Sequence, residues 1–412
     1  MHSKMTSPSF RRGSWVMRSM AAACLLATAV TATAGSREQA KRLHDRLAGV
    51  PPTETVLIQM AADITAGDPV AAAYQAMDNG AFYKVTLKNF VTPWTNEEQS
   101  VFAPLNDYTA TVIGMIRDDV DFREVLYGDI LYVGAASLGL PAYGMSNNAH
   151  YEALEDQDID LKTKLVRTSQ SAVTGLPAQA TAGVMTTRAA AKAFFIAGTN
   201  RAMLRFTLMN HLCTDMEQLK DISRSPDRIR QDVSRSPGGD SRIFLNNCIG
   251  CHAGMDPMAQ AYAYYNYSYD SAADPDGING RLTYNGVGAV DPATGSRVQA
   301  KYRINADNFK YGYLTTDDRW DNYWRSGSNA VLGWETGSGG SGSGAKSLGV
   351  ELAHSDAFAR CQVKKVFKAV CLRPPTDSAD FTKVDALVAS FKSSNYRMKR
   401  VFAETGAYCM GN

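Results

Sequence analysis

Cys248-Ile249-Gly250-Cys251-His252 is the stretch of this 412-residue sequence whose spacing specifies its chemistry. Two thiols three residues apart, followed directly by an imidazole, form the attachment pattern of a c-type haem. Residues three apart are neighbours on one helical turn, so Cys248 and Cys251 can both reach the vinyl edge of a porphyrin. The pattern predicts one covalent haem c with His252 as an axial iron ligand, and it identifies no catalytic residue.

A Cys-x-x-Cys pair also occurs in redox dithiols and as half of a zinc site. A zinc site needs a second ligand pair, and no second Cys-x-x-Cys or His-x₃-His follows the pentad. A thioredoxin-like dithiol needs a strand-helix-strand context, and no clear pattern of that kind precedes it. The remaining sequence therefore favours haem.

The N-terminus has the features of a secretory signal peptide. Four basic residues precede the apolar run Met20 to Val30, and Ala32-Thr33-Ala34 supplies small residues for cleavage. The run is too short to span a membrane, and no later segment approaches the roughly 20 apolar residues that a span needs. We expect residues 1–34 to be removed and the mature chain to be periplasmic or secreted, without a transmembrane segment.

The charge balance gives no reason to expect nucleic acid. The chain has 43 Lys and Arg against 41 Asp and Glu, and residues 1–34 carry four basic and no acidic residues. The mature chain therefore has 39 basic and 41 acidic residues, and the excess of positive charge belongs to the signal peptide.

Four cysteines of the mature chain lie outside the pentad: Cys213, Cys361, Cys371 and Cys409. An even number of thiols in an oxidising compartment indicates two disulfides. If Ser355 to Leu372 forms one helix, Cys361 and Cys371 are about 15 Å apart along it, beyond the limit of about 7 Å between bridged Cα atoms. One of the two should therefore pair with Cys409 and the other with Cys213.

The hydrophobic spacing predicts a mainly α fold. The expected architecture is a helical N-terminal bundle, a cytochrome c-like haem domain with a small β-hairpin, and a C-terminal helical bundle. The hairpin is expected within Arg281 to Ile304, around the turn-forming Asp291-Pro292-Ala293-Thr294-Gly295. Helices are expected near 36–47, 69–79, 105–117, 121–133, 186–220, 240–252, 355–372, 380–392 and 394–405.

The mature chain is several times longer than the roughly 100 residues of a minimal single-haem carrier, so it has room for more than one core. We divide it into an N-terminal helical region (35–150), a haem region (151–350) and a C-terminal bundle (351–412).

Several blocks resemble the planctomycete-type cytochrome c proteins, which are large exported haem proteins. The blocks are Asp121 to Tyr127, Ala182 to Thr187, Thr199 to Arg201, the pentad running into Asp256-Pro257, and Cys361 to Pro375. The resemblance implies haem c and export and says little about a substrate.

The pentad does not identify the sixth iron ligand. Met255 and Met258 follow His252 so closely that they fall on its side of the ring. Met398, Met410 and His354 lie in the C-terminal region, where the chain can return over the opposite face, and Met398 is our first choice. A buried core methionine is its alternative role. We interpret His44, His150 and His211 as ordinary surface or satisfied histidines.

Other side chains near the pentad have two interpretations each. Five tyrosines between residues 262 and 269 form either a wall against the haem, with hydroxyls reaching water, or a radical path to the surface. Arg228, Arg230 and Arg242 either pair with haem propionates or face solvent.

The preferred function is single-electron transfer with a periplasmic redox partner protein. A haem-dependent peroxidase or oxygenase with an open distal site is the alternative, and a structural or sensing role for the haem is a third possibility.

Overall fold

The computed structural model describes residues 34–196, 198–230, 241–304 and 312–411. This part of the chain is mainly helical and carries three two-stranded antiparallel sheets. Among the described residues, no helix combines the length and apolar character needed to cross a membrane. The predicted signal peptide lies outside the described residues except for Ala34.

The elements have the following bounds. The α-helices are α1 (Ser36–Ala48), α2 (Glu54–Thr65), α3 (Pro69–Met77), α4 (Leu87–Val91), α5 (Asp107–Arg117), α6 (Ala149–Asp156), α7 (Leu161–Lys164), α8 (Gln170–Thr174), α9 (Arg188–Phe194), α10 (Arg201–Leu212), α11 (Ser241–Ile243), α12 (Ile249–Ala259), α13 (Gly344–Ala353), α14 (Asp356–Cys371), α15 (Ser378–Ser393) and α16 (Met398–Cys409). The strands are β1 (Leu131–Gly134), β2 (Leu165–Thr168), β3 (Tyr265–Ser268), β4 (Arg281–Tyr284), β5 (Arg319–Asp321) and β6 (Ser341–Ser343).

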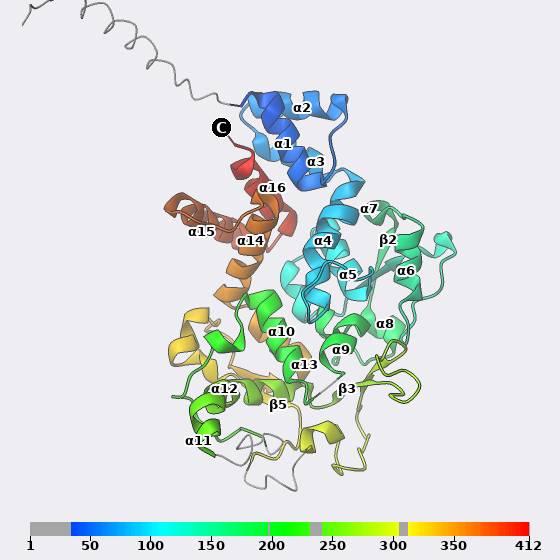
Figure 1. The fold of residues 1–412 in the computed structure, drawn as a ribbon, viewed down its shortest axis with the longest axis vertical. Helices are drawn as coiled ribbons and strands as arrows, with labels where there is room; N and C mark the ends of the chain where they lie inside the picture. Colours follow the sequence, from blue (N-terminus) through cyan, green and yellow to red (C-terminus); the bar gives the residue numbers. More distant parts are fainter. Residues whose placement is uncertain (1–33, 197, 231–240, 305–311, 412) are drawn as a thin grey trace, which may run out of the picture.

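The first and last helices pack together at one end of the molecule, where Figure 1 shows α16 beside α1 and α3. Asp68 caps α3 by accepting from the amide of Ala71, and Pro69 occupies its first turn, as the sequence predicted. One hydrophobic cluster includes Ala40 of α1 and Ala403 of α16. The predicted N-terminal and C-terminal regions therefore share a core.

Each of the three sheets consists of one antiparallel pair of short strands. β1 pairs with β2, β3 with β4, and β5 with β6, all antiparallel. The helix predicted over 121–133 is wrong, because this stretch forms a 3₁₀ turn at Phe122–Leu126 followed by β1. The amide of Gly128 closes the turn on the carbonyl of Glu124 at 2.7 Å, and the pairing with β2 holds the rest of the stretch extended.

The hairpin predicted within Arg281 to Ile304 is only partly present. The turn exists, because Asp291 and Ser296 form an isolated antiparallel bridge with an amide-to-carbonyl distance of 2.7 Å. However, β4 pairs with the preceding β3, and Ala300–Arg303 forms a 3₁₀ turn. Tyr265 and Tyr267 of β3 are both buried. Pairing of β4 with β3 therefore buries large aromatic side chains.

Three predicted helices have shifted bounds. The stretch 186–220 divides into α9 and α10, because Gly198 and Asn200 both adopt the left-handed conformation with φ of 62°. The helix predicted to end at residue 252 continues through α12 to Ala259. Asn395 and Tyr396 have φ of 55° and 58°, so the last helix begins only at Met398.

Two disulfides confirm that Cys361 and Cys371 pair with Cys213 and Cys409, and they decide between the two pairings that the sequence left open. Cys213 bonds Cys361 with a Cα–Cα distance of 5.2 Å, and Cys371 bonds Cys409 with a distance of 5.4 Å. Cys361 and Cys371 both lie on α14, which runs unbroken from Asp356 to Cys371, so the two cannot reach each other. Disulfides of this kind persist in oxidising compartments.

Candidate haem-attachment site

The pentad lies at the end of the molecule opposite α1–α3, where α11 and a π-helical turn (Phe244–Cys248) lead into α12 (Figure 1). Cys248 and Cys251 are both unbridged and partly exposed. The other four cysteines among the described residues are bonded in the two disulfides. The two thiols that the motif requires are therefore the two left reduced.

The imidazole of His252 contacts a carboxylate one turn further along α12. Its Nδ1 lies 3.1 Å from Oδ1 of Asp256. Nε2 of His252 hydrogen-bonds to none of the described residues. A carboxylate that fixes one ring nitrogen while the other faces a metal is the usual outer support of a histidine ligand.

Asp256 is fully buried and accepts from every side. Arg201 of α10 donates through Nε to Oδ1 at 2.7 Å and through its terminal nitrogen to Oδ2 at 3.0 Å. The amide of Arg230 donates to Oδ2 at 3.1 Å. Burial raises the pKa of Asp256, but Arg201, the hydrogen bond with His252 and Arg230 outweigh burial and hold the pKa well below its usual range. Asp256 is therefore an ionised acceptor.

Apolar side chains flank the thiols at the surface. Leu245, three residues before Cys248, is 56% exposed, and Ile222 is 73% exposed beside Gly250. The Cys251 thiol reaches toward the carbonyl of Met216, and burial raises the pKa of this thiol. Exposed apolar groups around partly exposed thiols form the kind of surface that a porphyrin covers.

At Gly254, α12 packs against Trp324. This side chain is fully buried, and a Cβ added to Gly254 would overlap its indole ring. Trp334 extends the contact by donating from Nε1 to the carbonyl of Trp324 at 2.9 Å. Glycine at 254 thus lets α12 lie directly on the ring, and this contact fixes the position of the thiol-bearing helix.

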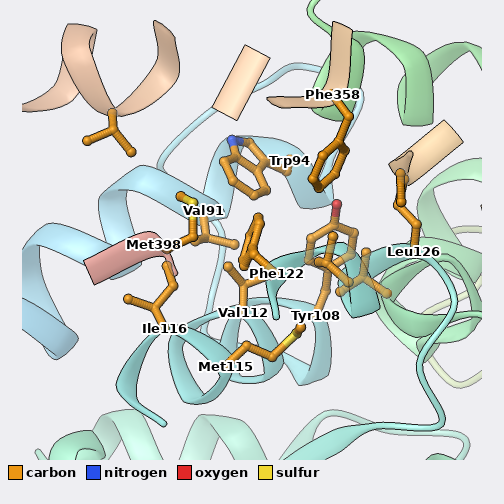
Figure 2. Close-up of a cluster of buried hydrophobic side chains, with 14 of the residues drawn as sticks. Val91, Trp94, Tyr108, Val112, Met115, Ile116, Phe122, Leu126, Phe358 and Met398 are labelled. Carbon is orange, nitrogen blue, oxygen red and sulfur yellow. The ribbon is translucent and has the colours of Figure 1, made fainter. Parts of the chain in front are cut away.

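The structure does not bring Met398, the expected sixth ligand, to His252. Met398 begins α16 and is buried in the cluster of Figure 2, where Val91, Ile116 and Phe122 surround it. Figure 1 shows α16 and α12 at opposite ends of the molecule. The expectation was wrong because Met398 lies at the apolar spacing of its helix, and a methionine at that spacing belongs to the core.

The other described histidines have partners of their own. His44 contacts the carbonyl of Val50, and His354 contacts that of Val350. The ring of His150 uses both nitrogens, one of them accepting from the amide of Gly134. Nε2 of His211 lies 2.8 Å from the hydroxyl of Tyr108. His44 and His150 are thus satisfied histidines, as the sequence suggested, whereas the buried His211 has a partner for Nε2 but none for Nδ1 among the described residues.

Arg228 and Arg230, two of the arginines considered as propionate partners, contact other side chains of the protein. Arg228 pairs with Asp321 at 2.6 Å. Arg230 is fully buried, with its guanidinium over the ring of Tyr302 and bonded to Thr199. Neither expected role applies to Arg230, because it belongs to the packing around Asp256.

The tyrosines after the pentad belong to the core. The hydroxyl of Tyr262 donates to the sulfur of Met185 at 3.2 Å, and that of Tyr265 donates to the carbonyl of Ala180 at 2.6 Å. Tyr267 likewise donates to the carbonyl of Gly277. The hydroxyls of these three tyrosines are therefore bonded inside the protein, which corrects the expectation that they reach water beside a haem. Tyr269, by contrast, is half-buried.

Asp256 and Arg201 are the site residues whose role the sequence reasoning missed. Both stood in blocks quoted for the family resemblance, without a physical role. One signal was present, because an acidic residue four positions after His252 lies on the same helix face. The partnership with Arg201 connects residues 55 apart and leaves no local pattern.

Comparisons of this chain with family models, curated proteins and solved structures find no match.

Proposed function

We propose that this chain is an exported c-type cytochrome that carries one covalent haem and transfers single electrons. The observation that carries the proposal is the state of the cysteines. Four of the six described cysteines are bridged, and the reduced pair is the one spaced for haem attachment beside a histidine.

The residues around the pentad are chemically suited to this cofactor. Cys248 and Cys251 would form the thioether bonds, and Nε2 of His252 would bind the iron. Leu245 and Ile222 supply apolar contact near the thiols, and the buried Asp256 keeps the imidazole oriented. Bound haem c would supply reversible one-electron oxidation and reduction at the iron.

The surroundings of α12 support electron transfer in particular. The haem-binding face would lie at one end of an elongated molecule, away from the core formed by α1–α3 and α16 (Figure 1). A cofactor edge close to the surface allows a partner protein to approach, and the partly exposed thiols mark that edge. We infer that a periplasmic redox protein docks there.

The test is expression of the full chain together with haem-maturation enzymes. We expect the wild-type protein to keep haem on a denaturing gel and to gain the mass of one haem. Cys248→Ala/Cys251→Ala should lose both signals. Cys371→Ala/Cys409→Ala is the matched control, because it removes two cysteines from the disulfide set and should retain haem.

A wild-type protein that folds without covalent haem under these conditions would overturn the proposal. Optical spectra then separate electron transfer from the alternative enzyme. A low-spin spectrum that is unchanged by carbon monoxide supports a six-coordinate electron carrier. A high-spin spectrum with rapid carbon monoxide binding would instead support a peroxidase or oxygenase.

A further inference from the structure

A buried carboxylate near the pentad contacts the ring nitrogen of His252 that would not bind iron. Asp256 is fully buried, and its Oδ1 lies 3.1 Å from Nδ1 of His252. A backbone carbonyl satisfies the same nitrogen in many histidine ligands. Here the acceptor is a carboxylate that also accepts two hydrogen bonds from the guanidinium of Arg201.

We propose that Asp256 sets the reduction potential of the haem through His252, with Arg201 acting in the opposite direction. This inference rests on the proposed function. Asp256 is a positioning residue, since it acts on the iron only through the imidazole.

The direction of the Asp256 effect follows from its hydrogen bond. An ionised carboxylate only accepts, so Nδ1 of His252 must donate and Nε2 must present its lone pair. Partial withdrawal of the Nδ1 proton makes the imidazole a stronger donor to a metal. A stronger donor stabilises the ferric iron more than the ferrous iron, which lowers the reduction potential.

Arg201 competes for the same oxygen. Its Nε donates to Oδ1 at 2.7 Å, shorter than the 3.1 Å contact from His252. The guanidinium therefore draws negative charge away from the hydrogen bond to the imidazole. Loss of Arg201 should strengthen the histidine–carboxylate bond and lower the potential further.

A second ion pair on the same helix provides a control. Arg205 follows Arg201 by one turn of α10 and binds Asp215 through Nε and a terminal nitrogen, both at 2.7 Å. This pair has the same fork geometry but is partly exposed, and neither side chain hydrogen-bonds to His252. Asp215→Asn and Arg205→Gln change the charge without changing the support of the imidazole.

The experiment is equilibrium titration of the haem-loaded protein with a dye mediator. Each reduced dye gives up one electron and is oxidised, and each ferric haem accepts one and becomes ferrous. We expect Asp256→Asn to favour reduction by about tenfold, which equals about 59 mV for one electron. Arg201→Gln should shift the equilibrium the other way, and the two control variants should shift it several-fold less.

The outcomes separate this inference from the proposed function. If the wild type carries no covalent haem, both fail. If it carries haem but Asp256→Asn shifts the equilibrium no more than Asp215→Asn, only the role of Asp256 fails. Should Asp256→Asn not fold because the guanidinium of Arg201 loses the carboxylate, the double variant Asp256→Asn/Arg201→Gln replaces the buried ion pair with two neutral side chains. Reduction no more favourable than in the wild type would then overturn the inference.

Discussion

Replacing Gly254 with alanine should dislodge the contact between α12 and Trp324. A Cβ at this position would lie within 2.8 Å of three atoms of the indole ring, whereas carbon atoms in contact stand about 3.5–4.0 Å apart. Trp324 is fully buried and cannot swing into solvent. Losing the packing of a buried tryptophan costs about 3–5 kcal/mol, and alanine returns about 1 kcal/mol through its helix propensity. We therefore expect a net destabilisation of about 2–4 kcal/mol.

Urea unfolding of the wild type and of Gly254→Ala, followed by tryptophan fluorescence, measures this difference. Gly250→Ala is the control on the same helix, because its Cβ would meet the side chain of the exposed Lys220, which can move away. The control should unfold within about 1 kcal/mol of the wild type. If Gly254→Ala also unfolds within about 1 kcal/mol of the wild type, the contact with Trp324 does not fix α12 and the reasoning is refuted.

Three further variants test other parts of the structure. Met398→Ala should leave the haem spectrum unchanged and lower the free energy of unfolding by about 2–5 kcal/mol; a changed spectrum would restore Met398 as a ligand. Opening the Cys371–Cys409 disulfide by double alanine substitution should cost about 4 kcal/mol by loop entropy for a sequence separation of 38, and equal urea midpoints would contradict this. Burial raises the pKa of Glu351, but its hydrogen bonds, led by the one from Arg325, lower it by more. The stability gained from this lowered pKa is complete above the unfolded value of about 4.3 and is lost as the pH falls through the folded pKa. Glu351→Gln should therefore be less stable than the wild type at neutral pH, and this difference in the free energy of unfolding should disappear in acid. A difference in urea midpoint that stays constant with pH would show that ionisation of Glu351 does not contribute to stability.

Local signals in the sequence predicted the parts of the fold that depend on neighbouring residues. Ser355 caps α14 by accepting from the amide of Phe358, and Asp68 with Pro69 starts α3. The exclusion of a Cys361–Cys371 disulfide also followed from local geometry, because one unbroken helix keeps these two cysteines apart. These features need no knowledge of distant segments.

Pairing between distant segments explains most of the errors. The stretch 121–133 has apolar residues at helical spacing, yet β1 forms because β2, more than thirty residues later, satisfies its backbone groups. Met398 carries a thioether, which can bind haem iron. Only the packing in Figure 2 shows that Val91 and Phe122 enclose this side chain in the core. In both places tertiary contacts outweigh what the local sequence favours.

The network around Asp256 belongs to the same class of long-range features, and its arrangement has an energetic consequence. A carboxylate buried without partners would cost several kcal/mol, so Asp256 requires Arg201 from α10 to remain ionised inside the protein. That requirement ties α12 to α10 and so orients the face that bears the thiols. The same ion pair that stabilises the buried charge also weakens its hold on His252, because both donors share Oδ1. One carboxylate therefore influences both the stability of the fold and the donor strength of His252. A substitution at Asp256 or Arg201 that changes the free energy of unfolding should also change the reduction potential.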